Sequence, residues 1–109
     1  MDLEGLAREV LNAYSRLIEE NLDEGNRLVM HFVGLVTYLW RAKAVETSEV
    51  SKVASYLRKA IIEGPDMLNP YLVELLGILE EGLNETNYAE LTEKLKMLEQ
   101  EERLDRLEV

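Results

Sequence analysis

The spacing of apolar residues along the chain predicts an all-α protein with four or five helices and no strand. Between Leu3 and Leu17 apolar positions recur at intervals of three and four residues, which is the period of one face of an α-helix. Asp2 stands directly before this stretch and is a suitable N-cap. The pattern therefore predicts an amphipathic helix over Leu3–Glu20, followed by a turn over the Asn-, Asp- and Gly-rich residues 21–26.

The second predicted helix, over residues 27–45, is apolar around most of its circumference. Two neighbouring stripes at helical spacing consist of Leu28, Phe32, Leu35 and Leu39, and of Val29, Val33, Val36 and Trp40. A helix with so wide an apolar surface must be covered on more than one side. We therefore expect it to be the central helix of a bundle, or to supply a subunit interface as well.

A third helix is predicted over residues 47–63. Either Thr47 or Ser48 can cap its N-terminus. Gly64 and Pro65 end it, because glycine readily takes the left-handed conformation after a helix and proline cannot continue one.

The fourth predicted helix covers Pro70–Glu81. Asn69 provides an N-cap, and proline is favoured at the first helical position because its missing N–H is not needed there. Gly77, in the middle of this segment, indicates close approach of a neighbouring helix.

The fifth helix is predicted to start at residues 87–90, which have the spacing of a capping box. Its apolar stripe ends at Leu98, and the mostly charged residues 99–109 are expected to form a solvated helical end or a frayed tail. Residues 1–98 are thus predicted to form a single-domain helical bundle of four main helices plus this fifth one. Short connections make mostly antiparallel neighbours.

Composition excludes several chemistries and leaves an uneven charge. The chain has 109 residues, no cysteine and one histidine, so disulfides, thiolate metal sites and any mechanism with two histidines are excluded. The net charge is −10, which on average repels nucleic acid and anionic membranes. Residues 41–62 nevertheless carry five basic and two acidic groups, whereas residues 63–109 carry four basic and thirteen acidic groups.

No catalytic, cofactor-binding or metal-ligating set is predicted. His31 is isolated, and we expect it to be a hydrogen-bonded residue at a packing edge. One carboxylate pattern, Glu-x-x-Glu at 46–49 and Glu-x-x-Asp at 63–66, resembles the magnesium motif of the all-α nucleotide pyrophosphohydrolases, which are similar to this chain in size and class. Magnesium ligands of this kind need pairs on one helical face, and Gly64 with Pro65 breaks the second pair.

The favoured function is therefore a small non-enzymatic interaction or scaffold protein, with a protein partner or a second copy in a homodimer, no cofactor and no small-molecule substrate. The candidate interaction surface comprises Phe32, Val36, Tyr38, Trp40, Arg41, Lys52, Arg58 and Lys59, with Tyr71 as a further candidate anchor. One alternative is a nucleic-acid-associated protein that uses the basic face of residues 41–59, against which the net charge weighs. A second alternative is a Mg-dependent all-α nucleotide pyrophosphohydrolase.

The expected location is cytoplasmic, without a membrane partner. The first residues lack the basic and apolar regions of a secretory signal. The most apolar stretch, residues 28–40, would rise about 20 Å as a helix, short of the ~30 Å hydrocarbon core of a bilayer. The Glu-rich, cysteine-free composition is compatible with a thermophilic source.

Overall fold

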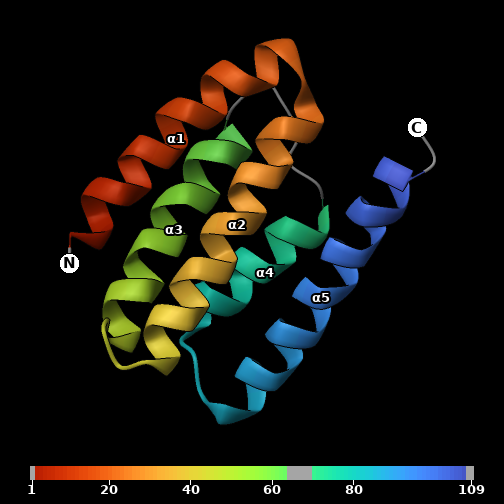
Figure 1. Ribbon diagram of the computed structural model, residues 1–109. Helices are drawn as coiled ribbons and strands as arrows, with labels where there is room; N and C mark the ends of the chain where they lie inside the picture. Colours follow the sequence, from red (N-terminus) through yellow and green to blue (C-terminus); the bar gives the residue numbers. More distant parts are fainter. Residues whose placement is uncertain (1, 64–69, 108–109) are drawn as a thin grey trace.

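The computed structural model describes residues 2–63 and 70–107, with side chains at 2–61 and 70–101. In these residues the chain forms five α-helices and no strand: α1 (Leu3–Glu20), α2 (Leu22–Arg41), α3 (Thr47–Glu63), α4 (Pro70–Glu81) and α5 (Glu85–Leu107). Successive helices run in opposite directions, and α1–α2 and α3–α4 pack as neighbouring pairs (Figure 1). The predicted all-α bundle with mostly antiparallel neighbours is confirmed.

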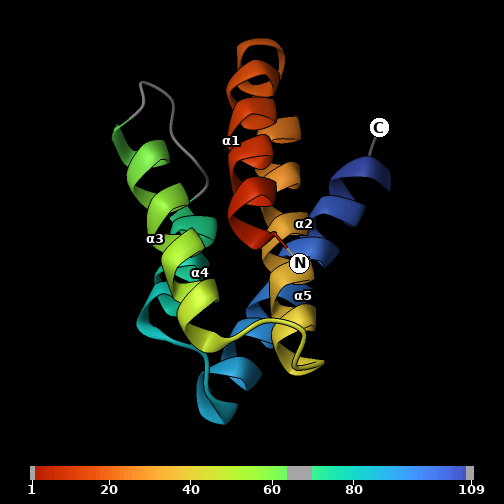
Figure 2. The same cartoon turned by 90° about the vertical axis from the view of Figure 1, so that its left-hand side faces the viewer.

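Helix α2 lies at the centre of the bundle and contacts all four other helices. Figure 2 shows the α3–α4 pair on one side of α2 and the C-terminal part of α5 on the other. Val29, Val33 and Val36 of α2 are completely buried. The wide apolar surface of this helix is therefore largely covered within one chain, and its exposed large apolar residues are Leu22 at the first position, Leu35 and Tyr38.

The core draws on every helix. Its completely buried large side chains are Val29, Val33, Val36, Val50, Leu57, Leu75, Leu76, Leu79 and Leu91. Each leucine of this set removes a whole isobutyl group from water, a contribution of about 1.5–3 kcal/mol per side chain. Packing of these faces, more than helix propensity, stabilises helices of this length.

The predicted turn over residues 21–26 is wrong, because a single residue joins α1 to α2. The N–H of Asn21 donates to the Leu17 carbonyl at 2.7 Å and ends α1. Its side-chain oxygen accepts from the Asp23 N–H at 2.9 Å and caps α2. Helix α2 consequently begins at Leu22, and Gly25 lies inside it against α1.

The junction of α2 and α3 also differs from expectation. Helix α2 ends at Arg41 and not at Val45, because Lys43 adopts the left-handed conformation with a φ of 62°. The residue before α3 is Glu46, and its N–H donates to the Glu49 carboxylate at 3.1 Å, which forms one half of a capping box. Glu46 therefore takes the capping position that the sequence assigned to Thr47 or Ser48.

Helix α4 begins at Pro70 as predicted, and Gly82 follows its end with a φ of 107°, a conformation that favours glycine. Helix α5 begins at Glu85, two residues earlier than predicted. Asn84 and Asn87 cap it reciprocally, since the backbone N–H of each donates to the side-chain oxygen of the other at 2.7 and 3.0 Å.

Two further expectations concern glycine and the bilayer. The close approach predicted at Gly77 is not found, because a Cβ at this position would meet no described atom within 4 Å.

No helix in the described parts of the chain combines the length and the apolarity that a membrane crossing requires. The boundary residues Asn69, Gly64, Pro65 and Asp66 lie outside the described residues.

Candidate functional site

The predicted interaction residues divide between the core and the surface. Phe32 and Val36 are buried, with 3% and 0% of their surface exposed, so they contribute to the core of this chain and not to its surface. The remaining six, all at least partly accessible, are Tyr38, Trp40, Arg41, Lys52, Arg58 and Lys59. These six belong to two regions, the C-terminal end of α2 and the outer side of α3.

At the end of α2, aromatic and cationic side chains join three helices. Trp40 Nε1 donates to Thr47 Oγ1 of α3 at 2.8 Å, and its ring lies 5.7 Å from the ring of Tyr88 on α5. The guanidinium of Arg41 stands 5.2 Å from the centre of the same Tyr88 ring, within the range of a cation–π contact. Trp40 and Arg41 thus make their contacts inside the chain, whereas Tyr38 remains 69% exposed.

The basic residues of α3 do not act together. Lys52 and Lys59 are exposed, and Tyr56 lies between them at intervals of four and three residues, so the three share one side of the helix. Arg58 instead reaches α4, where its Nη1 lies 3.1 Å from a carboxylate oxygen of Glu80. Ser51 Oγ donates to the carbonyl of the same Glu80 at 2.5 Å. Part of the basic segment therefore docks the acidic C-terminal third of the same chain.

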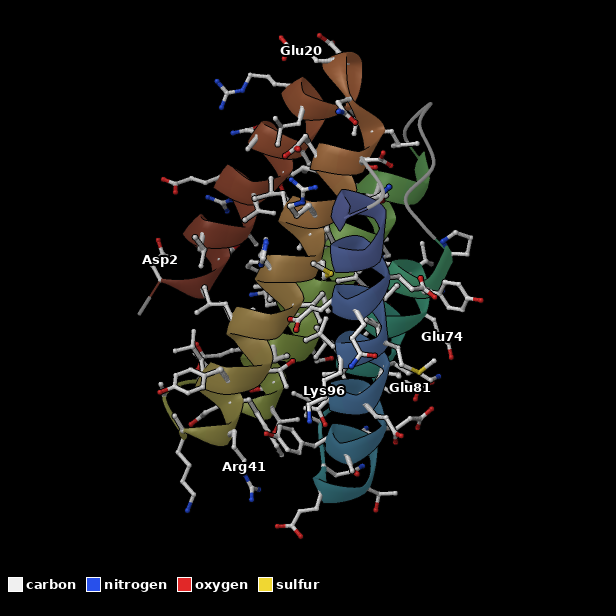
Figure 3. The ribbon with its side chains drawn as sticks, turned by 45° about the vertical axis from the view of Figure 1, so that its right-hand side comes forward. Asp2, Glu20, Arg41, Glu74, Glu81 and Lys96 are labelled. Carbon is white, nitrogen blue, oxygen red and sulfur yellow. The ribbon has the colours of Figure 1, made fainter. Side chains whose placement is uncertain are left out.

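A groove of about 300 Å³ lies between α4 and α5. Tyr71 and Glu74 of α4 line one side, and Met97, Leu98 and Glu101 of α5 line the other, with Lys94 between them. Tyr71 and Met97 are large apolar side chains that nevertheless expose 61% and 58% of their surface. In Figure 3 the labelled Glu74 and Glu81 mark the α4 side of this edge, and Lys96 marks the opposite side of α5, towards α2.

The charge along the groove is negative. Lys94, the one cation among the described residues that line the groove, forms ion pairs with Glu74 and with Glu90. The Glu90 carboxylate oxygen lies 3.1 Å from the ammonium nitrogen. The hydrogen bonds that Lys94 donates to Glu74, and secondly to Glu90, raise the pKa of Lys94 above its usual value. Lys94 is thus a paired cation, and Glu101 adds a further carboxylate to the rim.

The carboxylate pattern of the pyrophosphohydrolase motif is used for capping in its first half. Glu49 accepts from the N–H of Glu46 at the start of α3, as stated above. The side chain of Glu63 and all of Asp66 lie outside the described residues. Within the described residues, no group of three or more His, Asp and Glu side chains is placed to hold a metal ion. His31, expected at a packing edge, is exposed on α2.

Sequence reasoning identified Tyr71 as a candidate anchor but did not identify Met97. Met97 does not belong to the apolar stripe of α5, which passes through Tyr88, Leu91, Leu95 and Leu98. An apolar residue outside the core-facing stripe of an otherwise charged helix is the pattern that could have revealed it.

In comparisons with known proteins, no family model, no curated protein and no solved structure matches this chain.

Proposed function

We propose that this chain is a small, non-enzymatic interaction protein that binds another protein through the groove between α4 and α5. The observation that carries this proposal is the exposure of Tyr71 and Met97 along one groove. Tyrosine and methionine are enriched at protein interfaces relative to the rest of protein surfaces, and aromatic anchors account for much of the binding energy.

Site-specific photo-crosslinking tests this function without knowledge of the partner. A benzophenone amino acid replaces Met97 in the groove or, as a control, the exposed Asn12 on α1. In cells that make the protein natively, irradiation is expected to yield a discrete adduct with another protein from position 97 and none from position 12. Equal labelling from both positions, or none from either, contradicts an interaction role for this surface.

A homodimer would need a different surface from the one that the sequence suggested. Most of the apolar surface of α2 is buried within one chain, so the large apolar residues that α2 leaves exposed to a second copy are Leu22, Leu35 and Tyr38. Light scattering measures the mass directly. A dimer that Tyr38→Ser converts to a monomer would support self-association through α2, and a monomer at all concentrations would exclude it.

Nucleic-acid binding is a second candidate, because Tyr56 stands exposed between Lys52 and Lys59. Basic groups that follow a phosphate backbone, together with aromatic rings on which bases stack, are the features of single-strand binding surfaces. If α3 binds RNA, retention of a labelled single strand falls as salt rises, and Lys52→Glu with Lys59→Glu abolishes it. Retention that does not change with salt or with these substitutions excludes this function.

A further inference from the structure

The groove between α4 and α5 has the chemistry to select its partner. We propose that it binds a basic amphipathic helix, whose apolar side chain lies between Tyr71 and Met97 and whose Lys or Arg residues meet Glu74 and Glu101. This inference rests on the proposed function and adds the class of partner.

The shape of the groove favours a helix. It lies between two antiparallel helices, and the side-chain ridges of a third helix pack readily into such a depression. Its volume of about 300 Å³ is at the lower end of the range for ligand pockets, so it suits one or two large side chains better than a larger ligand. A helix that presents apolar residues at intervals of three and four would place those side chains along the groove.

The apolar surface of the groove supplies the affinity. Tyr71 and Met97 come from different helices, and both expose more than half of their surface. Leu98, which is partly buried and packs against the core, continues the apolar lining inwards. Methionine adapts to differently shaped partners because it is unbranched and polarizable, and tyrosine adds a ring with a polar end.

The negative charge of the groove favours a positively charged partner. Among the described side chains that line the groove, the carboxylates of Glu74 and Glu101 outnumber the ammonium group of Lys94 by two to one, and Glu90 beside the groove also pairs with Lys94. The whole of residues 63–109 carries thirteen acidic and four basic groups, which extends the same sign beyond the groove. An acidic helix would be repelled, whereas a basic helix gains both faster association and paired charges at the rim.

A synthetic peptide tests the inference. The probe is a fluorescein-labelled helix of about 18 residues that contains only leucine, lysine and alanine, with leucine along one face. In one control peptide glutamine replaces leucine, and in another glutamate replaces lysine. Fluorescence anisotropy is expected to give binding for the first peptide that is at least about tenfold tighter than for either control.

Matched protein variants separate the groove from the overall negative charge. Glu74→Gln with Glu101→Gln is compared with Glu9→Gln and Glu19→Gln on α1, which changes the net charge equally at exposed positions. The groove pair is expected to weaken binding about tenfold and the α1 pair less than about twofold. Met97→Ser is likewise expected to weaken binding about tenfold. Circular dichroism verifies that each variant is folded.

Three results would overturn the inference. Equal losses for the groove pair and the α1 pair would mean that the peptide responds only to net charge. Equal binding of a control peptide would mean that leucine or lysine does not matter. Self-association of the protein alone that Glu74→Gln with Glu101→Gln abolishes would make a second copy the occupant. In each case the photo-crosslinks from position 97 remain an independent measure of the interaction role itself.

Discussion

The contact of Gly25 with α1 predicts opposite effects of one substitution at two glycines. A Cβ at Gly25 would lie 2.5 Å from Cγ2 of Ile18 and 3.2 Å from two ring carbons of Tyr14. The first distance is almost an ångström shorter than ordinary van der Waals contact. Ile18 cannot easily rotate away, because a β-branched residue in a helix has one strongly preferred χ1 rotamer. Gly77→Ala adds the same methyl group to the interior of α4, where no described atom lies within 4 Å.

The cost of overpacking and the gain in helix propensity together decide whether each substitution stabilises or destabilises the protein. Overpacking costs about 1–3 kcal/mol, and replacement of glycine by alanine in a helix gains up to about 1 kcal/mol. Gly25→Ala should therefore destabilise the protein by about 1–2 kcal/mol, whereas Gly77→Ala should stabilise it by about 0.5–1 kcal/mol. For a domain of this size each kcal/mol corresponds to about 4–8 °C in Tm.

Thermal and urea unfolding, followed by circular dichroism at 222 nm, measure both variants against the parent protein. The Tm is expected to be highest for Gly77→Ala, intermediate for the parent protein and lowest for Gly25→Ala. A Gly25→Ala variant that is as stable as the Gly77→Ala variant would refute the close packing of α1 on α2. A destabilised Gly77→Ala variant would instead refute the open surroundings of that glycine.

Three further predictions follow from single residues. Leu57→Ala empties a completely buried site and should lower the free energy of unfolding by about 2–5 kcal/mol in urea titrations, and a loss below 1 kcal/mol would contradict its place in the core. Asn84→Ala removes half of the reciprocal cap of α5 and should cost about 0.5–2 kcal/mol, with no loss if the cap is not formed. An NMR titration of the Lys94 side chain should give a midpoint above the usual lysine value, and Glu74→Gln should lower it. Because the pKa of Lys94 is raised, its ion pairs stabilise the fold fully at a pH below the usual lysine pKa, and this stabilisation is lost as the pH rises through the raised pKa. A titration midpoint that Glu74→Gln leaves unchanged would exclude the ion pair between Lys94 and Glu74.

The helices could be predicted from the sequence because their apolar period is local information. Their boundaries could not all be predicted, because a residue can serve two helices at once. Asn21 ends α1 with its backbone N–H and caps α2 with its side chain, so no turn of several residues is needed. For this reason Gly25, which was assigned to a turn, lies inside α2 and approaches α1. The prediction for Gly77 was wrong for another reason, because a glycine within a helix does not by itself show whether a neighbouring helix comes close.

The groove could be predicted only in part. An exposed anchor at Tyr71 was foreseeable, because a tyrosine directly after Pro70 lies in the first turn of α4 and outside its leucine stripe. The second exposed residue of the groove, Met97, was not foreseeable, because its position across the groove from Tyr71 depends on how α5 folds back along α4. A groove lined by residues 71 and 97 has no local pattern in the sequence, and only the tertiary arrangement creates it.

The burial of α2 changes what its composition means for association. A helix that is apolar around most of its surface is often taken to indicate an interface, but in a five-helix bundle one helix can contact all the others. Val29, Val33 and Val36 are fully covered in this way, so they contribute to folding and leave nothing to a partner. The side chains that folding does not cover are more informative, because each exposed tyrosine or methionine keeps apolar area in water that a partner could bury. Tyr71 and Met97 are two of these residues and share a groove with a negative rim, which is why the binding hypothesis moves from α2 to α4 and α5.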